Sequence, residues 1–251
     1  MSAILKRVLD VLLSLVALVV LSPILSLAAF GVWLSDRGPI LYRARLTGRN
    51  GRPFTMYKLR TMRVNHGAFQ SVITADRDPR VFRFGAWLRR AKLDELPQLL
   101  NILRGDMSIV GPRPEHPDIV SRHYRPEHRE LLDVRPGLTS PGTLYDYAHG
   151  DALVGRSDPE RAYVERLLPL RLALDLVYVR RASLGYDAAL VARTVRMIAA
   201  TVLGGGLGTA ADPPELVQAR RLLAAPHSPR PAAAEPRDGG GRSRRTAAAQ
   251  L

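Results

Sequence analysis

The chain has 251 residues, 24% of them charged and 46% hydrophobic, which is enough for one fair-sized domain with appendages. Lysine and arginine total 37 against 23 aspartates and glutamates, so the formal net charge is +14. This balance indicates anionic partners: nucleic acid, an anionic membrane surface or a phosphorylated substrate. Cysteine is absent, which excludes disulfides, thiolate catalysis and cysteine-ligated zinc.

The first feature along the chain is an uncharged apolar run at residues 11–34, "VLLSLVALVVLSPILSLAAFGVWL". At about 1.5 Å per residue, a helix of this length can cross a hydrocarbon core of roughly 30 Å. The run is longer than the ~7–15-residue core of a signal peptide, which argues against a cleaved leader. Pro23 in its middle predicts a kink, and Ser22 can bond a backbone carbonyl of the preceding turn.

Basic residues flank both ends of this run. Lys6 and Arg7 precede it, and five arginines follow it between residues 37 and 52. Cytoplasmic ends of membrane helices attract basic residues, so a helix–break–helix hairpin that enters and leaves on one face suits both clusters. The alternative is a kinked helix that crosses the membrane, oriented by the larger C-terminal cluster. The residues alone leave both arrangements open.

Residues 38–62 read as two strands joined by a turn at Asn50-Gly51, which predicts a β-hairpin. Lys58 and Arg60 lie two residues apart in the second strand and therefore share a face. They are either a solvated basic face or a pair of phosphate ligands.

The stretch "KLDELPQLLNILRG" at 92–105 predicts a helix. Asp94 can be its N-cap, Pro97 falls in the first turn where proline is tolerated, and Gly105 closes the end. The plain structural interpretation of Asp94 is thus an N-cap, which would stabilise the helix by roughly 1 kcal/mol.

The same position also suits chemistry. The helix dipole and the nearby cations Arg89, Arg90 and Lys92 would keep the Asp94 carboxylate ionised. An ionised carboxylate among cations can bind Mg²⁺ or attack phosphorus. The cap and the nucleophile need the same surroundings, so the residues do not separate them.

The stretch "SIVGPRP" at 108–114 follows directly. Pro112 and Pro114 restrict the backbone on both sides of Arg113. A guanidinium presented in this rigid way suits bidentate phosphate binding or stacking on a base, although a stiff exit loop explains the prolines equally well.

The last third of the chain divides into two parts. Residues 158–206 hold two helical patterns, and from 205 the chain is rich in Gly, Ala, Pro and Arg without a sustained period. We therefore predict a membrane segment at 1–36, a catalytic domain at 37–204 and a disordered basic tail at 205–251.

Taken together, these motifs resemble the bacterial sugar transferase family, the monotopic polyprenyl-phosphate phosphoglycosyl transferases. The resemblance runs from about residue 4 to 200, and its most specific part is "LDELPQLLNILRGDMSIVGPRP" at 93–114. Further matches are "KRVLD" at 6–10, "LSP" at 21–23, "GRNGRPFTMYKLRTM" at 48–62, "DPR" at 78–80, "LRR" at 88–90 and "RPGLT" at 135–139. Ala44, Phe82 and Lys92 depart from the pattern, which usually has Gln, Thr, and Ser or Thr there.

The resemblance implies an α+β fold: a small, mostly helical catalytic domain with a short β-hairpin, anchored by an N-terminal re-entrant helix broken at Ser22-Pro23. It implies that Asp94 and Glu95 form a catalytic dyad. Asp94 would attack a UDP-sugar, release UMP and carry a phospho-sugar, which a polyprenyl (undecaprenyl) phosphate would then accept in the first membrane step of exopolysaccharide assembly.

The resemblance also implies a set of binding residues and a location. Mg²⁺ would contact Asp94, and the substrate would be bound by Arg113 with Pro112 and Pro114, by Arg89 and Arg80, and by Lys58 and Arg60. The catalytic domain would face the cytoplasm at the bacterial inner membrane, next to anionic lipid. Neither the sugar nor the oligomeric state follows from the sequence.

Two other functions fit parts of the sequence. A membrane-tethered basic protein that binds nucleic acid would suit the charge, but aromatic residues make up only 6% of the chain and no helix-turn-helix or RNA-binding motif is present, so nucleic acid is not an expected partner. An inactive scaffold of the same fold is the other alternative, because Phe82 and Lys92 depart from the family pattern.

Overall fold

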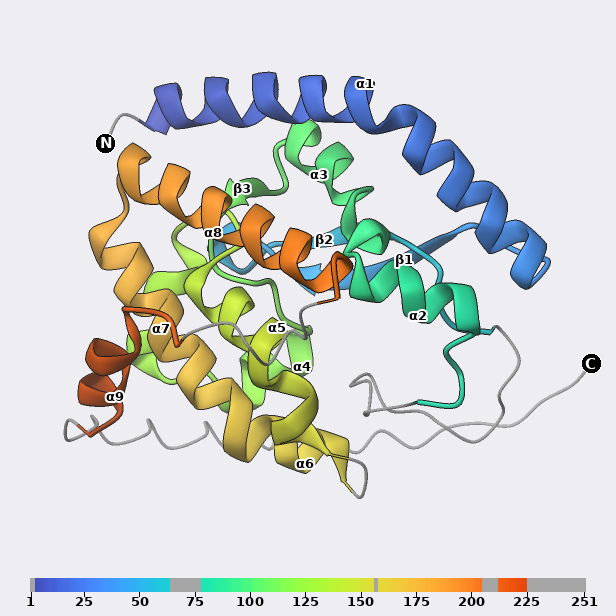
Figure 1. The fold of residues 1–251 in the computed structure, drawn as a ribbon. Coiled ribbons are helices and arrows are strands. Elements are labelled where there is room, and N and C mark those ends of the chain that lie inside the picture. The colour runs from blue at the N-terminus through green and yellow to red at the C-terminus, as the bar shows by residue number, and fades with distance from the viewer. Residues whose placement is uncertain (1–2, 64–77, 156–157, 205–211, 225–251) are drawn as a thin grey trace, which may run out of the picture.

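The computed structural model describes residues 3–63, 78–155, 158–204 and 212–224 (Figure 1). This part of the chain is mostly helical, with two small sheets. The helices are α1 Ala3–Ser35, α2 Arg83–Arg90, α3 Gln98–Arg104, α4 Pro117–His123, α5 Pro141–Val154, α6 Pro159–Ala162, α7 Leu168–Arg181, α8 Leu184–Val202 and α9 Leu216–Ala224. The strands are β1 Leu41–Thr47, β2 Pro53–Leu59, β3 Ser108–Val110 and β4 Gly137–Thr139. Short 3₁₀ turns lie at η1 Arg49–Gly51, η2 Leu93–Glu95 and η3 Pro126–Leu132, and a π-helical turn at η4 Tyr163–Leu167.

Helix α1 is long, apolar and bent, as Figure 1 shows. Pro23 lies inside it, and the Ser22 hydroxyl donates to the Val19 carbonyl at 2.8 Å, so the predicted bond to the preceding turn is confirmed. Among the described residues, α1 alone is long and apolar enough to cross a membrane. Most of its apolar side chains are exposed, including Leu27 at 71%, and such a surface is suited to lipid rather than to water.

The N-terminal end of α1 is tied to the globular body by polar contacts. Lys6 Nζ lies 2.6 Å from a carboxylate oxygen of Asp187, and an Arg7 nitrogen donates to the Ile102 carbonyl at 2.7 Å. The buried Asp10 carboxylate accepts from the Ser108 hydroxyl at 2.8 Å. These bonds join the first turns of α1 to α3, β3 and α8.

The other end of α1 packs on the same body. Its buried Ala28 and Val32 form one hydrophobic cluster with Leu59 of β2, Phe82 and Leu88 of α2. Helix α1 thus lies along the domain with both ends attached, rather than projecting from it (Figure 1).

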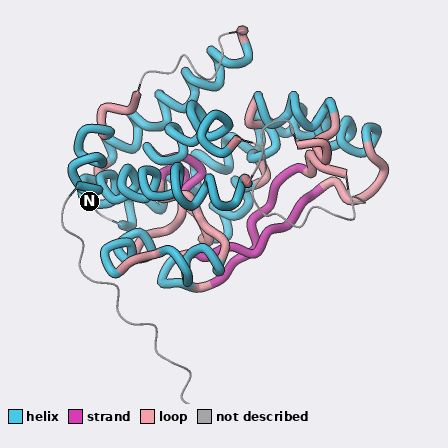
Figure 2. Tube along the Cα trace, turned by 90° about the horizontal axis from the view of Figure 1, so that it is seen from below, coloured by secondary structure: helices cyan, strands magenta, loops and turns pink. Residues whose placement is uncertain are grey.

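The predicted β-hairpin is confirmed. Strands β1 and β2 pair antiparallel from Leu41 opposite Leu59 to Thr47 opposite Pro53, and they run together at one side of the molecule in Figure 2. The turn has positive φ at Asn50 (56°) and Gly51 (72°), the backbone that made this pair a hairpin signal.

A second sheet was not predicted from the sequence. Strands β3 and β4 pair in parallel, with Ser108 opposite Gly137 and Val110 opposite Thr139. Gly111 and Gly137 approach so closely that a Cβ on Gly137 would overlap the backbone of Gly111. The sheet therefore joins two distant sequence motifs and fixes the start of the loop that carries Arg113.

The N-cap predicted at Asp94 is wrong. Helix α3 begins at Gln98 with Pro97 as its N-cap residue, and Asp94 lies in the preceding turn η2 without a side-chain cap bond. Lys92, in the left-handed conformation (φ 56°), turns the chain between α2 and η2, and Leu96 and Pro97 separate the acidic pair from α3. The predicted end at Gly105 is confirmed by its φ of 94°.

The C-terminal boundary also needs correction. Residues 212–224 were predicted to be disordered, but Leu216–Ala224 form α9 and pack Ala219 against Ala173, Leu174 and Val177 of α7. This short helix is stabilised by packing on distant residues, and its nine residues are too few to show a sustained apolar period in the sequence. The remainder of the predicted tail lies outside the described residues.

One departure from the family pattern, Phe82, has a structural reason. It occupies the N-cap position of α2 without a cap bond, and its ring is buried in the cluster under α1. We expect Phe82→Ala to lower the free energy of unfolding by about 3–5 kcal/mol, as for other buried phenylalanines. Thermal and denaturant unfolding in detergent would measure this. Phe30→Ala on the exposed face of α1 is the control, and an equal loss in both variants would contradict the argument.

Candidate active site

Glu95 is the centre of a buried polar cluster. Its Oε1 accepts from Lys58 Nζ at 3.0 Å and from an Arg113 nitrogen at 3.3 Å. Its Oε2 accepts from the Tyr147 hydroxyl at 2.9 Å and from Gln98 Nε2 at 3.3 Å. These donors come from β2, the loop after β3, α5 and α3, so one carboxylate connects four parts of the chain.

The charge on Glu95 follows from these partners. Burial alone would raise the pKa of this carboxyl, but the positive charges of Lys58, Arg113 and Lys92 hold the pKa well below its usual range. Glu95 is therefore an anion that organises the cations around it.

Asp94, its neighbour, is in the opposite situation. Within the described part of the chain, its buried Oδ1 has no hydrogen-bond partner. Burial raises the pKa of Asp94, and the charge of Glu95 raises it further against the opposing charges of Lys58, Lys92 and Arg89. From the sequence we expected a helix dipole and nearby cations to favour the ionised form of Asp94. The raised pKa shows that its surroundings favour the protonated form instead. Asp94 lacks the cap position, and desolvation exceeds the attraction of the cations.

Lys92 and Arg113 both face the ring of Tyr147. The Lys92 ammonium lies 3.4 Å from the ring centroid and the Arg113 guanidinium carbon 5.8 Å from it. Burial lowers the pKa of Lys92 against the charges of Glu95, Asp94 and Asp146, whereas Glu95 and Tyr147 hold the pKa of Arg113 well above its ordinary value in spite of burial. Two cations thus face one aromatic ring, whose hydroxyl donates to Glu95.

Arg89 and Arg80 lie at the edge of this cluster. Arg89 Nε donates to the Thr61 hydroxyl at 2.8 Å. Burial lowers the pKa of Arg89, and the nearby charge of Asp94 offsets part of this effect. Arg80 forms a forked pair with the buried Asp78, with nitrogen–oxygen distances of 3.0 and 2.6 Å. That pair holds the pKa of Asp78 below its usual value.

Arg60 is placed apart from Lys58. The second strand ends at Leu59, and the buried Arg60 side chain bonds the Pro39 carbonyl at 2.6 Å and pairs with Asp36 just after α1. Its role here is to fasten the end of α1 to the hairpin. The prediction that Lys58 and Arg60 share a face is therefore wrong, because β2 ends at Leu59, between them.

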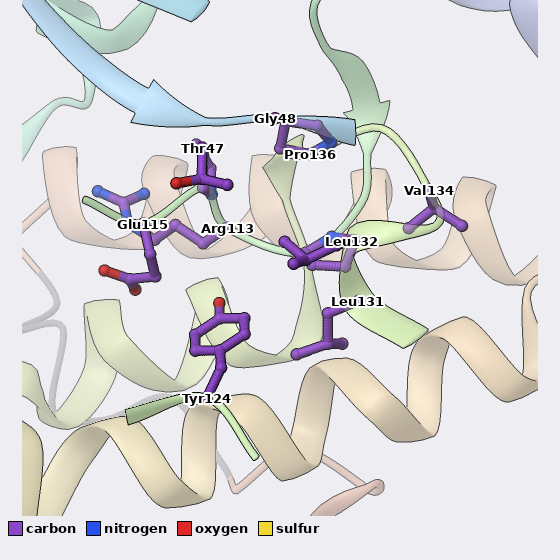
Figure 3. A pocket seen from close by; sticks show the side chains of 11 residues that line it. Thr47, Gly48, Arg113, Glu115, Tyr124, Leu131, Leu132, Val134 and Pro136 are labelled. Atoms are coloured by element: carbon purple, nitrogen blue, oxygen red, sulfur yellow. The ribbon is translucent and has the colours of Figure 1, made fainter. Parts of the chain in front are cut away.

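The prolines beside Arg113 border a small pocket, which Figure 3 shows from close by. The Tyr124 hydroxyl points into it. Its lining comprises Thr47, Gly48, Pro112, Arg113, Pro114, Glu115, Tyr124, Leu131, Leu132, Val134 and Pro136. The backbone of the Arg113 loop therefore forms one wall of this pocket, while its guanidinium reaches Glu95.

Comparison with known proteins shows to which family this chain belongs. A family model described as bacterial sugar transferase matches residues 1–201. The chain belongs to the bacterial sugar transferase family. This confirms the resemblance inferred from the motifs, including its end near residue 200.

Named bacterial sugar transferases are similar over most of this chain. A UDP-glucose:undecaprenyl-phosphate glucose-1-phosphate transferase of Caulobacter vibrioides is 40% identical over 200 residues, covering 78% of this chain and 70% of that protein. A protein of the same name from Xanthomonas campestris pv. campestris is 39% identical over 79% of this chain, which spans only 39% of its length. The exopolysaccharide production protein PSS of Rhizobium leguminosarum bv. phaseoli is 37% identical over 78% of this chain and 95% of its own length. The chain is accordingly an enzyme of the phosphoglycosyl transferase class.

Several members of the cluster were not predicted from the sequence. Tyr147 and Asp146 lie on α5 in no recognisable motif, and only the fold brings them to Glu95 and Arg113. Gln98 follows the acidic pair by one helical turn, so its spacing was a usable signal. Asp175 on α7 was also missed, although it accepts from the backbone nitrogens of Arg113 at 3.2 Å and Gly142 at 3.0 Å.

Asp175 leads to a prediction about pH in this sugar transferase. Burial raises the pKa of Asp175 to about 6, above the unfolded value of about 3.9. Its contribution to stability is thus fully present below about pH 4 and is lost as pH rises through about 6, by about 3 kcal/mol in all. We expect Asp175→Asn to remove this part of the pH dependence of unfolding in detergent. The exposed Asp151→Asn is the control, and an unchanged slope in Asp175→Asn would contradict the prediction.

Proposed function

We propose that the protein transfers a sugar-1-phosphate from a UDP-sugar to a polyprenyl phosphate, as the first membrane step of exopolysaccharide assembly. The observation that carries the proposal is the buried Asp94 oxygen without a hydrogen-bond partner beside the fully bonded, anionic Glu95. One carboxylate is free to react, while its neighbour arranges the cations that receive phosphate. The names of the relatives support the same pair of substrates.

The first step is attack by an Asp94 carboxylate oxygen on the phosphorus that bears the sugar. A bond forms between that oxygen and the phosphorus, and the bond from the phosphorus to the bridging oxygen breaks. UMP leaves with the bridging oxygen and its electron pair. A carboxylate whose pKa is raised by burial is a stronger nucleophile than an ordinary one, which suits this role.

The second step returns the enzyme to its starting state. An oxygen of the polyprenyl phosphate attacks the phosphorus of the aspartyl phospho-sugar, and the bond to Asp94 breaks. The products are the polyprenyl-diphosphate-sugar and the free carboxylate. Lys58 and Arg113, positioned by Glu95, would stabilise the negative charge that develops on the phosphoryl oxygens in both steps, with Arg89 beside them.

The residues present fit Mg²⁺ in a limited way. The unpartnered Asp94 oxygen is a suitable ligand, and the described residues contain no cluster of three or more His, Cys, Asp or Glu side chains for a metal. Mg²⁺ commonly takes one or two carboxylates together with substrate phosphates, so Asp94 would hold it jointly with the diphosphate. When bound there, the ion neutralises phosphate charge.

The arrangement of α1 supports a re-entrant anchor. Its 33 residues would span about 50 Å as a straight helix, which would carry its ends to opposite sides of a bilayer. Yet Arg7 near one end and Val32 near the other both contact the same globular body. A re-entrant helix that is continuous but bent near Ser22-Pro23, with both ends and the catalytic domain on the cytoplasmic face, accommodates these contacts.

A labelling experiment tests this topology. The chain lacks cysteine, so Ser2→Cys and Asp118→Cys each create one labelling site. In intact cells, we expect an impermeant thiol reagent applied from the periplasmic side to label neither. Labelling of Ser2→Cys but not of Asp118→Cys would show that α1 crosses the membrane and would refute the hairpin.

The reaction itself is tested by UMP release from the full chain in detergent, with undecaprenyl phosphate, Mg²⁺ and one UDP-sugar at a time. We expect release with at least one sugar, and we expect EDTA to stop it and excess Mg²⁺ to restore it. No release with any donor would favour the inactive scaffold. Salt-sensitive binding to random DNA without UMP release would favour a nucleic-acid-binding protein.

A further inference from the structure

Lys92 has an unusual backbone conformation for its residue type. Among the non-glycine residues that the structure describes, only Asn50 and Lys92 have a positive φ. Asn50 needs it for the hairpin turn, but Lys92 lies between α2 and η2, where no hairpin is formed. A left-handed backbone is unfavourable for an ordinary residue, and such strain is found preferentially at functional sites.

The ammonium of Lys92 is held by an aromatic ring alone. It lies 3.4 Å from the centroid of Tyr147, whose hydroxyl is fixed on Glu95 at 2.9 Å. In the part of the chain that the structure describes, its Nζ has neither a hydrogen-bond acceptor nor a carboxylate at ion-pair distance. An ammonium has three donors, and no described protein group accepts from those of this half-buried lysine.

The other cations of the cluster differ in this respect. Lys58 and Arg113 both bond Glu95, and Arg113 also lies 3.9 Å from Asp146. Lys92 is close enough to Asp94, Glu95 and Asp146 for their charges to act on it, yet it is paired with none of them. An anion that entered beside Asp94 would meet an ammonium whose N–H donors are not committed to any described acceptor.

We propose that Lys92 binds a phosphoryl oxygen of the donor diphosphate, held in place by the face of the Tyr147 ring. The proposal rests on the proposed function and deepens it, because it assigns a substrate-binding cation next to the nucleophile. It also gives a reason for the left-handed backbone, after which the ammonium lies over the Tyr147 ring of α5. Lys92 acts on the diphosphate and not on the uridine or the lipid chain.

Binding of UDP, UMP and uridine to the full-length protein tests this, by calorimetry in detergent. We expect Lys92→Met to weaken UDP binding about 10- to 100-fold, the usual value of a hydrogen bond to a charged group. Uridine should bind the variant as it binds the wild type, and Lys92→Arg should stay within a few-fold for UDP. Equal UDP affinity in wild type and Lys92→Met, or no UDP binding by the wild type, would overturn the proposal.

Tyr147 provides a second, independent test. We expect Tyr147→Leu to weaken UDP binding and to make the further change Lys92→Met nearly without effect, since the ammonium has lost its support. Tyr147→Phe keeps the ring and serves as the matched control, in which Lys92→Met retains its full effect. Additive effects of Tyr147→Leu and Lys92→Met would show that the ring does not position Lys92.

Failure of this proposal is distinguishable from failure of the proposed function. A wild type that binds UDP through Lys92 but releases no UMP from any donor would leave the binding site intact and remove the reaction. Normal UMP release by Lys92→Met with an unchanged KM for the UDP-sugar would keep the reaction and remove Lys92 from it. With the reaction intact, we expect the donor KM to rise more than kcat falls.

Discussion

Asp94→Asn is expected to reduce UMP release by at least about 10³-fold, the scale seen when a covalent nucleophile is removed. The amide is the same size as the carboxyl but cannot attack phosphorus as an anion. Asp94 also has a buried oxygen without a hydrogen-bond partner in the described structure, so its charge does not hold the fold together. We therefore expect the variant to unfold at a temperature no lower than the wild type.

A control variant in the same assay distinguishes loss of the nucleophile from a general loss of activity. Asp151→Asn on the exposed side of α5 is the matched control and should retain full activity. A rate for Asp94→Asn within ten-fold of the wild type would exclude Asp94 as the nucleophile. A large fall in unfolding temperature would mean that Asp94 has a structural role instead.

Glu95→Gln is expected to impair both activity and stability. The carboxylate accepts from two donors on each oxygen, whereas an amide presents one nitrogen that can accept from none of them. Whichever way the amide turns, two donors lose their acceptor, and Lys58 and Arg113 lose the charge that neutralises them. We expect the free energy of unfolding to fall by about 3–5 kcal/mol and the rate of UMP release by at least about 10²-fold.

The matched control for this change is Glu130→Gln. Glu130 makes a forked pair with Arg180 at 2.9 and 2.7 Å, but both side chains are more than two-fifths exposed. Such a surface pair is worth less than about 1 kcal/mol, so this variant should remain stable and active. Equal losses in the two variants would refute the special role of the buried cluster.

Local patterns predicted the parts of the fold that depend on the local backbone alone. Asp94, Glu95 and Arg113 lie within one short stretch of sequence, and the hairpin turn at Asn50-Gly51 and the helix end at Gly105 depend on residues that readily adopt a positive φ. The hairpin and the helix end need no distant partner, and the structure confirms both, whereas the N-cap predicted at Asp94 is wrong. The mostly helical fold with one small antiparallel hairpin follows from the same kind of signal.

Features that depend on distant contacts were missed or mistaken. Tyr147 reaches Glu95 across 52 positions of sequence, and no local motif marks it. The direction of the Asp94 pKa shift depends on burial, which a sequence does not reveal, and the apolar face of α9 is packed against the distant helix α7. The separation of Arg60 from Lys58 arises because the strand ends between them.

The central claim is that Asp94 carries the phospho-sugar, and it is tested most directly without the lipid acceptor. Purified full-length protein would be mixed with Mg²⁺ and the UDP-sugar that supports turnover, and UMP and the intact protein mass would be measured together. We predict UMP release that stops near one equivalent per enzyme, with a matching gain of one sugar phosphate in the wild type and none in Asp94→Asn. UMP that appears only when polyprenyl phosphate is added, with no change in protein mass, would contradict the covalent mechanism.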